Sequence, residues 1–273
     1  MTDSAWIGSL ALDTGWALFL GGSAATDLHA HHAIQIGLSV DDPIAWTLAG
    51  DRRLEGRGLA IGSDVPHAVA RAAAPVAHLY VDPESASGRR LAWAVGEGTR
   101  ATEGAAIERA CGRLAAAARS PNWPNLCELR VSLLAALGGA PAARPSDLDP
   151  RIARTLRRLR APDAAPVSGG DLASAVGLSV GRLSHLFRRQ TGVSIRTYRL
   201  WWKLRGAILA LHDGSNLTEA ALQGGFSDSA HLSRTFRRMF GATPSRAVGE
   251  LRILLPPGRT SQPDRSSEDF RAG

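Results

Sequence analysis

The 273-residue sequence predicts an α+β protein. An N-terminal small β-barrel with a helical extension is followed by an all-α domain with two helix-turn-helix motifs joined by a long helix. Three observations predict this fold class. Residues 14–81 contain short apolar or alternating runs separated by Gly, Asp and Pro, which is typical of closely spaced strands. Residues 102–137 place apolar side chains at helical spacing. Residues 183–192 recur at 232–241 with six of ten positions identical.

The first hundred residues are expected to form the barrel. Its predicted strands are GWALFLG, HHAIQIGLSV, DPIAWTL, GLAIGS and VAHLYV. No helical pattern separates these runs, and this favours an antiparallel sandwich or a small barrel.

Residues 101–137 are expected to form a helical extension of two helices. The segment EGAAIERACGRLAAAAR places Ile107, Cys111 and Leu114 on one face. Two prolines then interrupt the pattern, and NLCELRVSLLAAL continues it with leucines at helical spacing. Such a leucine stripe is typical of a core helix. It is also compatible with a helix that joins two copies in a homodimer.

The remaining chain divides into three segments. Residues 138–150, GGAPAARPSDLDP, have the composition of a linker, and residues 252–273 have that of a disordered tail. Between them, residues 151–251 hold 16 basic against 6 acidic residues, whereas residues 1–150 hold 12 Arg against 16 acidic residues. A basic domain favours a polyanionic partner, and nucleic acid before a membrane.

Several classes of protein are disfavoured. No run approaches the roughly 18 apolar residues that a membrane span requires. The N-terminus has no basic cluster before its apolar residues, so we expect no secretory signal. Two cysteines do not form a disulfide scaffold or a zinc cage. These observations predict a cytoplasmic protein with free thiols.

The repeated segment, LSxxFRRxxG, follows the same pattern in both copies. A short helix leads into a glycine-containing turn and then a second helix with an apolar stripe and paired arginines, as in a helix-turn-helix motif. Between the copies, SIRTYRLWWKLRGAILALHD is expected to form one helix. At 1.5 Å per residue it spans roughly 25 Å. It can therefore hold two recognition helices near successive major grooves, which lie about 34 Å apart.

Residues 168–248 resemble the C-terminal DNA-binding domain of the AraC/XylS family of bacterial transcription regulators. The resemblance is carried by LASAVGLSVGRLSHLFRRQTGVSIRTY and by GGFSDSAHLSRTFRRMFGATPS. The sequence departs from the family pattern at Ala220, at His231 and at Lys203, which stands where arginine is usual. The resemblance implies binding to double-stranded DNA through both recognition helices.

The same resemblance implies which side chains face the DNA. In the first recognition helix they are Gly181, Arg182, Ser184, His185, Arg188 and Arg189. In the second they are Ser229, Ala230, Ser233, Arg234, Arg237 and Arg238. Arg234 is the strongest candidate for reading a base, because arginine binds guanine O6 and N7 bidentately. The paired arginines are equally compatible with phosphate contacts or plain surface charge. The core positions are Leu183, Phe187, Leu232 and Phe236.

HAHHAIQ at 29–35 and DVPHAV at 64–69 resemble the two halves of a cupin pattern. A cupin-like barrel often precedes this DNA-binding domain, where it senses an effector or dimerises. His29, His31 and His67 occupy positions that hold metal in metal-binding cupins, and Gln35 stands in place of the usual carboxylate. The cluster is therefore a weak candidate effector or metal site. Imidazole ligands suit a divalent transition metal, but no cofactor is required by the sequence.

We interpret the sequence as a DNA-binding transcription regulator, an activator or repressor, and not an enzyme. A small effector or dimerisation through the first domain would control it, and an activator would also contact RNA polymerase. An alternative is a metal-dependent cupin enzyme fused to a nucleic-acid-binding domain. A second alternative is a non-specific DNA binder, against which the different residues of the two recognition helices argue.

Overall fold

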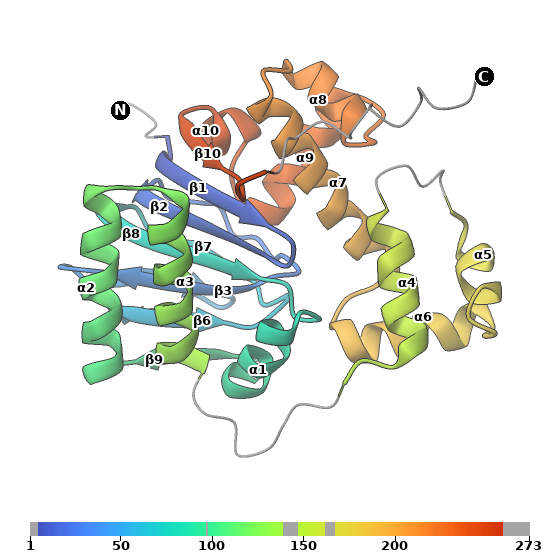
Figure 1. The fold of residues 1–273 in the computed structure, drawn as a ribbon, viewed down its shortest axis with the longest axis horizontal. Helices are drawn as coiled ribbons and strands as arrows, with labels where there is room; N and C mark the ends of the chain where they lie inside the picture. The colour runs from blue at the N-terminus through green and yellow to red at the C-terminus, as the bar shows by residue number, and fades with distance from the viewer. Residues whose placement is uncertain (1–4, 97, 139–146, 162–166, 259–273) are drawn as a thin grey trace, which may run out of the picture.

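The computed structural model describes residues 5–96, 98–138, 147–161 and 167–258. Its N-terminal half contains two β-sheets and its C-terminal half is helical (Figure 1). This arrangement confirms the α+β prediction. Among the described residues, no helix is long and apolar enough to cross a membrane.

The N-terminal half, called the β-domain below, is built from a seven-stranded and a three-stranded sheet. The larger sheet has the order β10-β1-β2-β8-β3-β6-β9. Its strands are β1 Ile7–Asp13, β2 Trp16–Ser23, β3 Ile34–Ser39, β6 Gly58–Ile61, β8 Ala72–Val81, β9 Thr99–Thr102 and β10 Leu251–Leu254. The smaller sheet has the order β5-β4-β7, with β4 Ile44–Leu48, β5 Arg53–Gly56 and β7 His67–Val69. The five predicted runs correspond to β2, β3, β4, β6 and β8.

Three helices complete the β-domain: α1 Ala86–Val95, α2 Ala105–Arg119 and α3 Trp123–Gly138. In Figure 1, α2 and α3 lie side by side across one face of the larger sheet. Four of the five leucines of the predicted stripe are fully buried there, at Leu126, Leu129, Leu133 and Leu137, and the fifth, Leu134, is half-buried. These leucines therefore belong to the core of the chain itself, and a homodimer would need another face of α3.

The C-terminal half contains the helices of the two predicted motifs and their long connecting helix, together with one helix before them and one after them. They are α4 Pro150–Arg160, α5 Gly169–Ser174, α6 Val180–Thr191, α7 Ile195–His212, α8 Leu217–Gln223, α9 Ser229–Phe240 and α10 Pro244–Val248. The 18-residue α7 is the expected long connecting helix. It joins the first motif, α5 and α6, to the second motif, α8 and α9 (Figure 1).

The prediction for residues 252–273 is wrong at its beginning. Residues 251–254 form β10, which pairs in parallel with β1 and places Ile253 opposite Leu10. The apolar LRIL segment forms a strand because it pairs with the free edge of β1. β1 lies more than 200 residues earlier in the sequence, so no local pattern predicts this pairing. The rest of the predicted tail, 259–273, lies outside the described residues, as do residues 139–146 of the predicted linker.

The two helix-turn-helix motifs relate differently to the β-domain. The first motif has its own core around Leu183, Phe187 and Tyr198. The second motif shares a core with the β-domain, in which Phe236 belongs to the same cluster as Phe19. Placement of the second motif is therefore coupled to the packing of the β-domain.

Candidate nucleic-acid interface and interdomain pocket

The two recognition helices begin and end in the same way. Each starts at a side-chain cap: Ser179 accepts a hydrogen bond from the Arg182 backbone N–H, and Asp228 accepts one from the His231 N–H. Each ends at a glycine in the left-handed conformation, Gly192 and Gly241. These caps satisfy the backbone groups that a helix end leaves unpaired. The matched ends explain why the sequence repeat gives two equivalent helices, α6 and α9.

The apolar positions of both helices are core, as predicted. Leu183 and Phe187 of α6 are at most 1% exposed, and Leu232 and Phe236 of α9 are at most 3% exposed. Because these side chains hold one face of each helix against the protein, the intervening positions point outward.

All of the predicted contact positions in α6 are exposed. They are Gly181, Arg182, Ser184, His185, Arg188 and Arg189. They come from consecutive turns of one helix, and they give the first motif a continuous polar face with three arginines. The structure therefore leaves this face accessible to a partner.

The predicted contact positions in α9 are less uniform. Ala230, Arg234 and Arg238 are exposed, whereas Ser229 and Ser233 are half-buried. Arg237 is exposed but donates to Asp27 of the β-domain, from Nε at 2.9 Å and from Nη2 at 2.7 Å. The interpretation of Arg237 as a DNA contact must account for this ion pair.

Asp228 sets the electrostatics at the start of α9. The backbone N–H of His231 and the Ser227 hydroxyl hold the pKa of this carboxyl below its usual range. The negative charge of this carboxylate is stabilised by the positive end of the helix dipole. Asp228 also precedes the first turn of α9, next to Ser229 and Ala230. Its negative charge therefore contributes to the exposed face of α9 that carries Arg234.

A buried polar network connects α4 and α7 to the β-domain. Glu84 lies 2.8 Å from His32 Nε2 and accepts hydrogen bonds from Arg160 at 2.6 Å and from the Tyr198 hydroxyl at 3.0 Å. Burial raises the pKa of Glu84, but His32 and Arg160 outweigh it and hold the value at about 2. The carboxylate is therefore ionised, and it fixes two helices of the C-terminal half on the β-domain.

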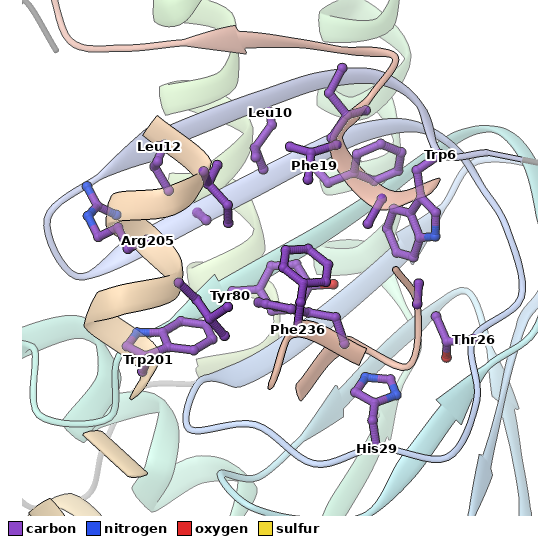
Figure 2. Close-up of a pocket in the computed structure, with 18 of the residues that line it drawn as sticks. Trp6, Leu10, Leu12, Phe19, Thr26, His29, Tyr80, Trp201, Arg205 and Phe236 are labelled. Carbon is purple, nitrogen blue, oxygen red and sulfur yellow. The ribbon is translucent and has the colours of Figure 1, made fainter. Parts of the chain in front are cut away.

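An apolar pocket lies between the two halves (Figure 2). It encloses about 100 Å³. The β-domain contributes Trp6, Phe19 and Tyr80 to its wall, and the C-terminal half contributes Trp201 and Phe236. Figure 2 shows Trp201 and Arg205 on one helix, facing strand β1, which carries Leu10 and Leu12.

Asp82 is the one carboxyl group among the described residues that line this pocket, and Arg205 is a basic group that lines it as well. Its Oδ1 accepts a hydrogen bond from Trp201 Nε1 at 2.9 Å. Burial and the neighbouring Glu84 raise the pKa of Asp82 to about 6. The pocket thus combines aromatic walls with a carboxyl group that changes charge near neutral pH.

The structure brings the predicted histidine cluster together. His29, His31 and His67 are all buried, and their ligand nitrogens lie within 4.8 Å of one another. Oε1 of Gln35 lies 3.0 Å from Nε2 of both His31 and His67. His29 also lines the pocket, on the side of Thr26 (Figure 2).

Comparison with known proteins identifies the C-terminal domain. A family model described as a helix-turn-helix domain matches residues 172–248. The arabinose operon regulatory protein of Escherichia coli is 38% identical over 82 residues, which are 29% of this chain and 28% of that protein. Residues 172–248 are an AraC-type helix-turn-helix domain. The Msm operon regulatory protein of Streptococcus mutans is 32% identical to this chain over 82 residues, 30% of each chain.

The chain spans less than a third of the length of these curated relatives. Solved structures match more of the fold. An apo form of ToxT from Vibrio cholerae superposes with a TM-score of 0.57 at 11% identity, over 85% of this chain and 96% of that one. ToxT bound to an unsaturated fatty acid gives 0.54 at 10% identity, over 88% and 98%. A β-rich domain followed by a helical domain is therefore a fold that the two proteins share.

Sequence reasoning missed the residues that join the two halves. Asp27, Glu84, Arg160 and Trp201 each make an interdomain contact. Their partners lie between 76 and 210 positions away in the chain. No local pattern marks such pairs, so the sequence carries no signal that would have found them.

Proposed function

We propose that this chain is a cytoplasmic, sequence-specific DNA-binding transcription regulator. The observation that carries the proposal is the pair of capped recognition helices, α6 and α9, each with its apolar face buried and its polar face outward. Two helices with different exposed residues can read two base sequences in successive turns of the major groove. The matched relatives are named as operon regulatory proteins, which favours a regulator over the metal-dependent enzyme.

Affinity and specificity would come from different residues. Arg188, Arg189 and Arg238 lie on the last turns of their helices, where phosphate contacts would release counterions and make binding salt-dependent. Arg182 and Arg234 lie on the earlier turns, where an arginine can bind the O6 and N7 atoms of a guanine. This division gives a basic domain that binds any duplex and prefers one sequence.

The interdomain pocket would bind the effector, an apolar small molecule. Its aromatic and aliphatic walls come from both halves of the chain, so an occupant contacts the β-domain and α7 or α9 together. A ToxT structure of the same fold is bound to an unsaturated fatty acid, which supports an apolar ligand. Such a ligand controls DNA binding only if its affinity differs between two placements of the second motif.

Two further partners belong to the proposal. A homodimer would let two copies occupy adjacent sites, and an exposed face of α3, where Val131 is 57% exposed, is available for it. If the protein is an activator, it also contacts RNA polymerase. Sedimentation of the free protein and of its DNA complex would measure the first of these.

Fluorescence anisotropy tests the DNA proposal directly. The full chain is titrated onto DNA from upstream of its own gene and onto a scrambled duplex of equal length, across a salt series. We expect binding to the upstream fragment to be tighter by about a thousandfold. Equal, steeply salt-dependent binding to both duplexes would contradict sequence specificity, and no binding to either would contradict the DNA proposal itself.

The effector is tested by tryptophan fluorescence, because Trp6 and Trp201 line the pocket. We expect a long-chain fatty acid to change the emission of the full chain and to shift its DNA affinity. Phe240→Trp fills pocket space and should lower the affinity for the fatty acid. Trp93 is an exposed residue of α1, so Trp93→Phe should leave that affinity unchanged. Equal affinity in all three proteins would place the ligand elsewhere.

A further inference from the structure

The segment that follows the second recognition helix lies along a single stretch of the β-domain. The backbone N–H of Trp6 donates to the Arg246 carbonyl of α10 at 3.0 Å. β10 then pairs in parallel with residues 8–11 of β1. Residues 244–254, called the strap below, comprise α10 and β10 and are held by residues 6–11.

The strap contributes side chains to both faces of the larger sheet. Ile253, opposite Leu10, is 8% exposed and belongs to the cluster that the β-domain shares with the second motif. Leu254 packs instead against the cluster that contains the buried sides of α2 and α3. Arg252 donates to the Pro121 carbonyl, between these two helices, at 3.4 Å. Successive side chains of one short strand therefore tie the end of the DNA-binding half to both cores of the β-domain.

The strap is also one wall of the interdomain pocket. Ala247 and Val248 of α10 and Leu251 of β10 line the pocket, together with Leu10 and Leu12 of β1 (Figure 2). An occupant of the pocket would therefore touch the strap and the strand that holds it. Such an occupant favours the paired state of β1 and β10, because it contacts both strands only when they lie together.

The other walls of the pocket are held more firmly than the strap. β10 has four residues and lies at the edge of the sheet, whereas β2 and β8 lie inside it. α10 has five residues, whereas α7, which carries Trp201, has 18. Short elements with few backbone hydrogen bonds are the parts of a fold that open most readily. We therefore expect the strap to be the wall that opens.

Opening of the strap would also affect the second motif. Residues 241–243 alone separate α9 from α10. On the other side of the motif, Trp201 of α7 donates to Asp82 of the β-domain at 2.9 Å. With the strap paired, the second motif is attached to the β-domain both before and after it in the chain. An open strap removes the second of these attachments.

We propose that the strap closes the interdomain pocket when β10 pairs with β1, and opens it when this pairing is lost. The closed strap fixes the second motif on the β-domain. Pocket occupancy and the placement of α9 are thereby coupled, and the size of the effect is the difference in the occupant's affinity for the two strap states. This coupling rests on the effector proposed above, whereas closure of the pocket by the strap does not.

Thiol labelling tests the closure with neither effector nor DNA present, so its result does not depend on the proposed function. Val69 of β7 lines the pocket and is 3% exposed. In Val69→Cys, a maleimide therefore reaches the new thiol when the pocket opens. Cys111 is 4% exposed in the cluster of α2 and α3, and it serves as the internal control because it reacts when the β-domain itself opens. Peptide mass spectrometry follows the two sites separately.

Two chains that differ in the strap are compared in the Val69→Cys background. One ends at Glu250 and lacks β10, and the other ends at Gly258 and keeps it. We expect loss of β10 to speed labelling of the new thiol by about tenfold or more, with Cys111 unchanged. Equal acceleration at both sites would show that β10 only stabilises the fold. That result, or an unchanged rate at the new thiol, would overturn the proposal.

A disulfide across the strap gives the opposite change without removing a residue. Ser9 and Arg252 are register partners of β1 and β10, and strands about 4.8 Å apart are within reach of a disulfide. In Ser9→Cys/Arg252→Cys, oxidation should slow labelling at Val69→Cys by about tenfold or more, and reduction should restore it. Ala60→Cys/Arg100→Cys, at the opposite edge of the same sheet, is the matched control. Labelling that ignores the strap disulfide, or that both disulfides slow equally, would overturn the proposal.

Discussion

Asp27 of the β-domain forms an ion pair with Arg237 of the second recognition helix, 210 residues further along the chain. Both side chains are more than half exposed. The carboxylate accepts hydrogen bonds from Nε and Nη2 of Arg237, so these two atoms are engaged within the protein. Since the Asp27 N–H also binds the Gly241 carbonyl, one residue holds both the side chain and the end of α9.

Asp27→Asn should raise the affinity for DNA and leave folding almost unchanged. An exposed ion pair contributes at most about 1 kcal/mol to stability, so releasing Arg237 is worth up to about fivefold in DNA affinity. Glu55→Gln is the matched control, because it removes the same charge from another exposed pair, Arg53–Glu55. Anisotropy with all three proteins measures the difference. An equal gain in both variants would attribute the effect to net charge alone.

Glu84→Gln should destabilise the junction between the halves. The substitution removes the charge that pairs with His32 and Arg160, and breaking a buried pair on one side costs about 3 kcal/mol or more. Urea unfolding followed by tryptophan fluorescence measures this loss. Glu108→Gln, which removes an exposed carboxylate paired with Arg57, should cost less than about 1 kcal/mol. Similar losses in the two variants would contradict the structural importance of the network.

The stability of the protein should depend on pH through Asp82. Its pKa is about 6 in the folded chain and about 3.9 in the unfolded chain, so the folded chain holds an extra proton between these values. The carboxyl therefore contributes on the order of 2–3 kcal/mol to the free energy of unfolding below about pH 4. This contribution is lost as the pH rises through about 6. The groups that face Asp82 are Glu84, His32 and Arg160.

The difference between the wild type and Asp82→Asn isolates this carboxyl, because the buried histidines titrate in both proteins. Asparagine keeps an oxygen for Trp201. Urea unfolding at each pH gives the free energy of unfolding of both proteins. We expect the value for Asp82→Asn minus the value for the wild type to be larger above pH 6 than at pH 4. A difference that does not change with pH would show that Asp82 keeps an ordinary pKa.

The sequence predicted what depends on local pattern. Alternating runs gave β2, β3 and β8, and the repeated LSxxFRRxxG gave α6 and α9 with Phe187 and Phe236 in the core. It did not predict β10, because a four-residue strand forms only where β1 offers an edge. Nor did it predict the ion pair of Arg237, since no local sequence pattern around Asp27 indicates a partner 210 residues away.

The histidine cluster lies between these two cases. The spacing of His29, His31 and Gln35 placed them together, and His67 joined them through a cross-strand bridge to His29. The carbonyls that orient their rings, from Asp27, Ala33 and Val65, depend on backbone direction. Residue types alone do not encode that direction, so the sequence located the cluster but not its hydrogen-bonding arrangement.

Arg234→Ala should relax recognition of a single base pair. Arg234 is exposed on α9. Unlike Arg237, it forms no ion pair with another described residue, so its guanidinium is available for a guanine. Loss of one bidentate contact should cost about 1–3 kcal/mol on the specific site and little on scrambled DNA. Arg119→Ala, an exposed arginine at the end of α2, removes the same charge outside the proposed interface. Anisotropy on a set of duplexes, each altered at one base pair, identifies the position that Arg234 reads. A uniform loss on every duplex would instead assign Arg234 to a phosphate.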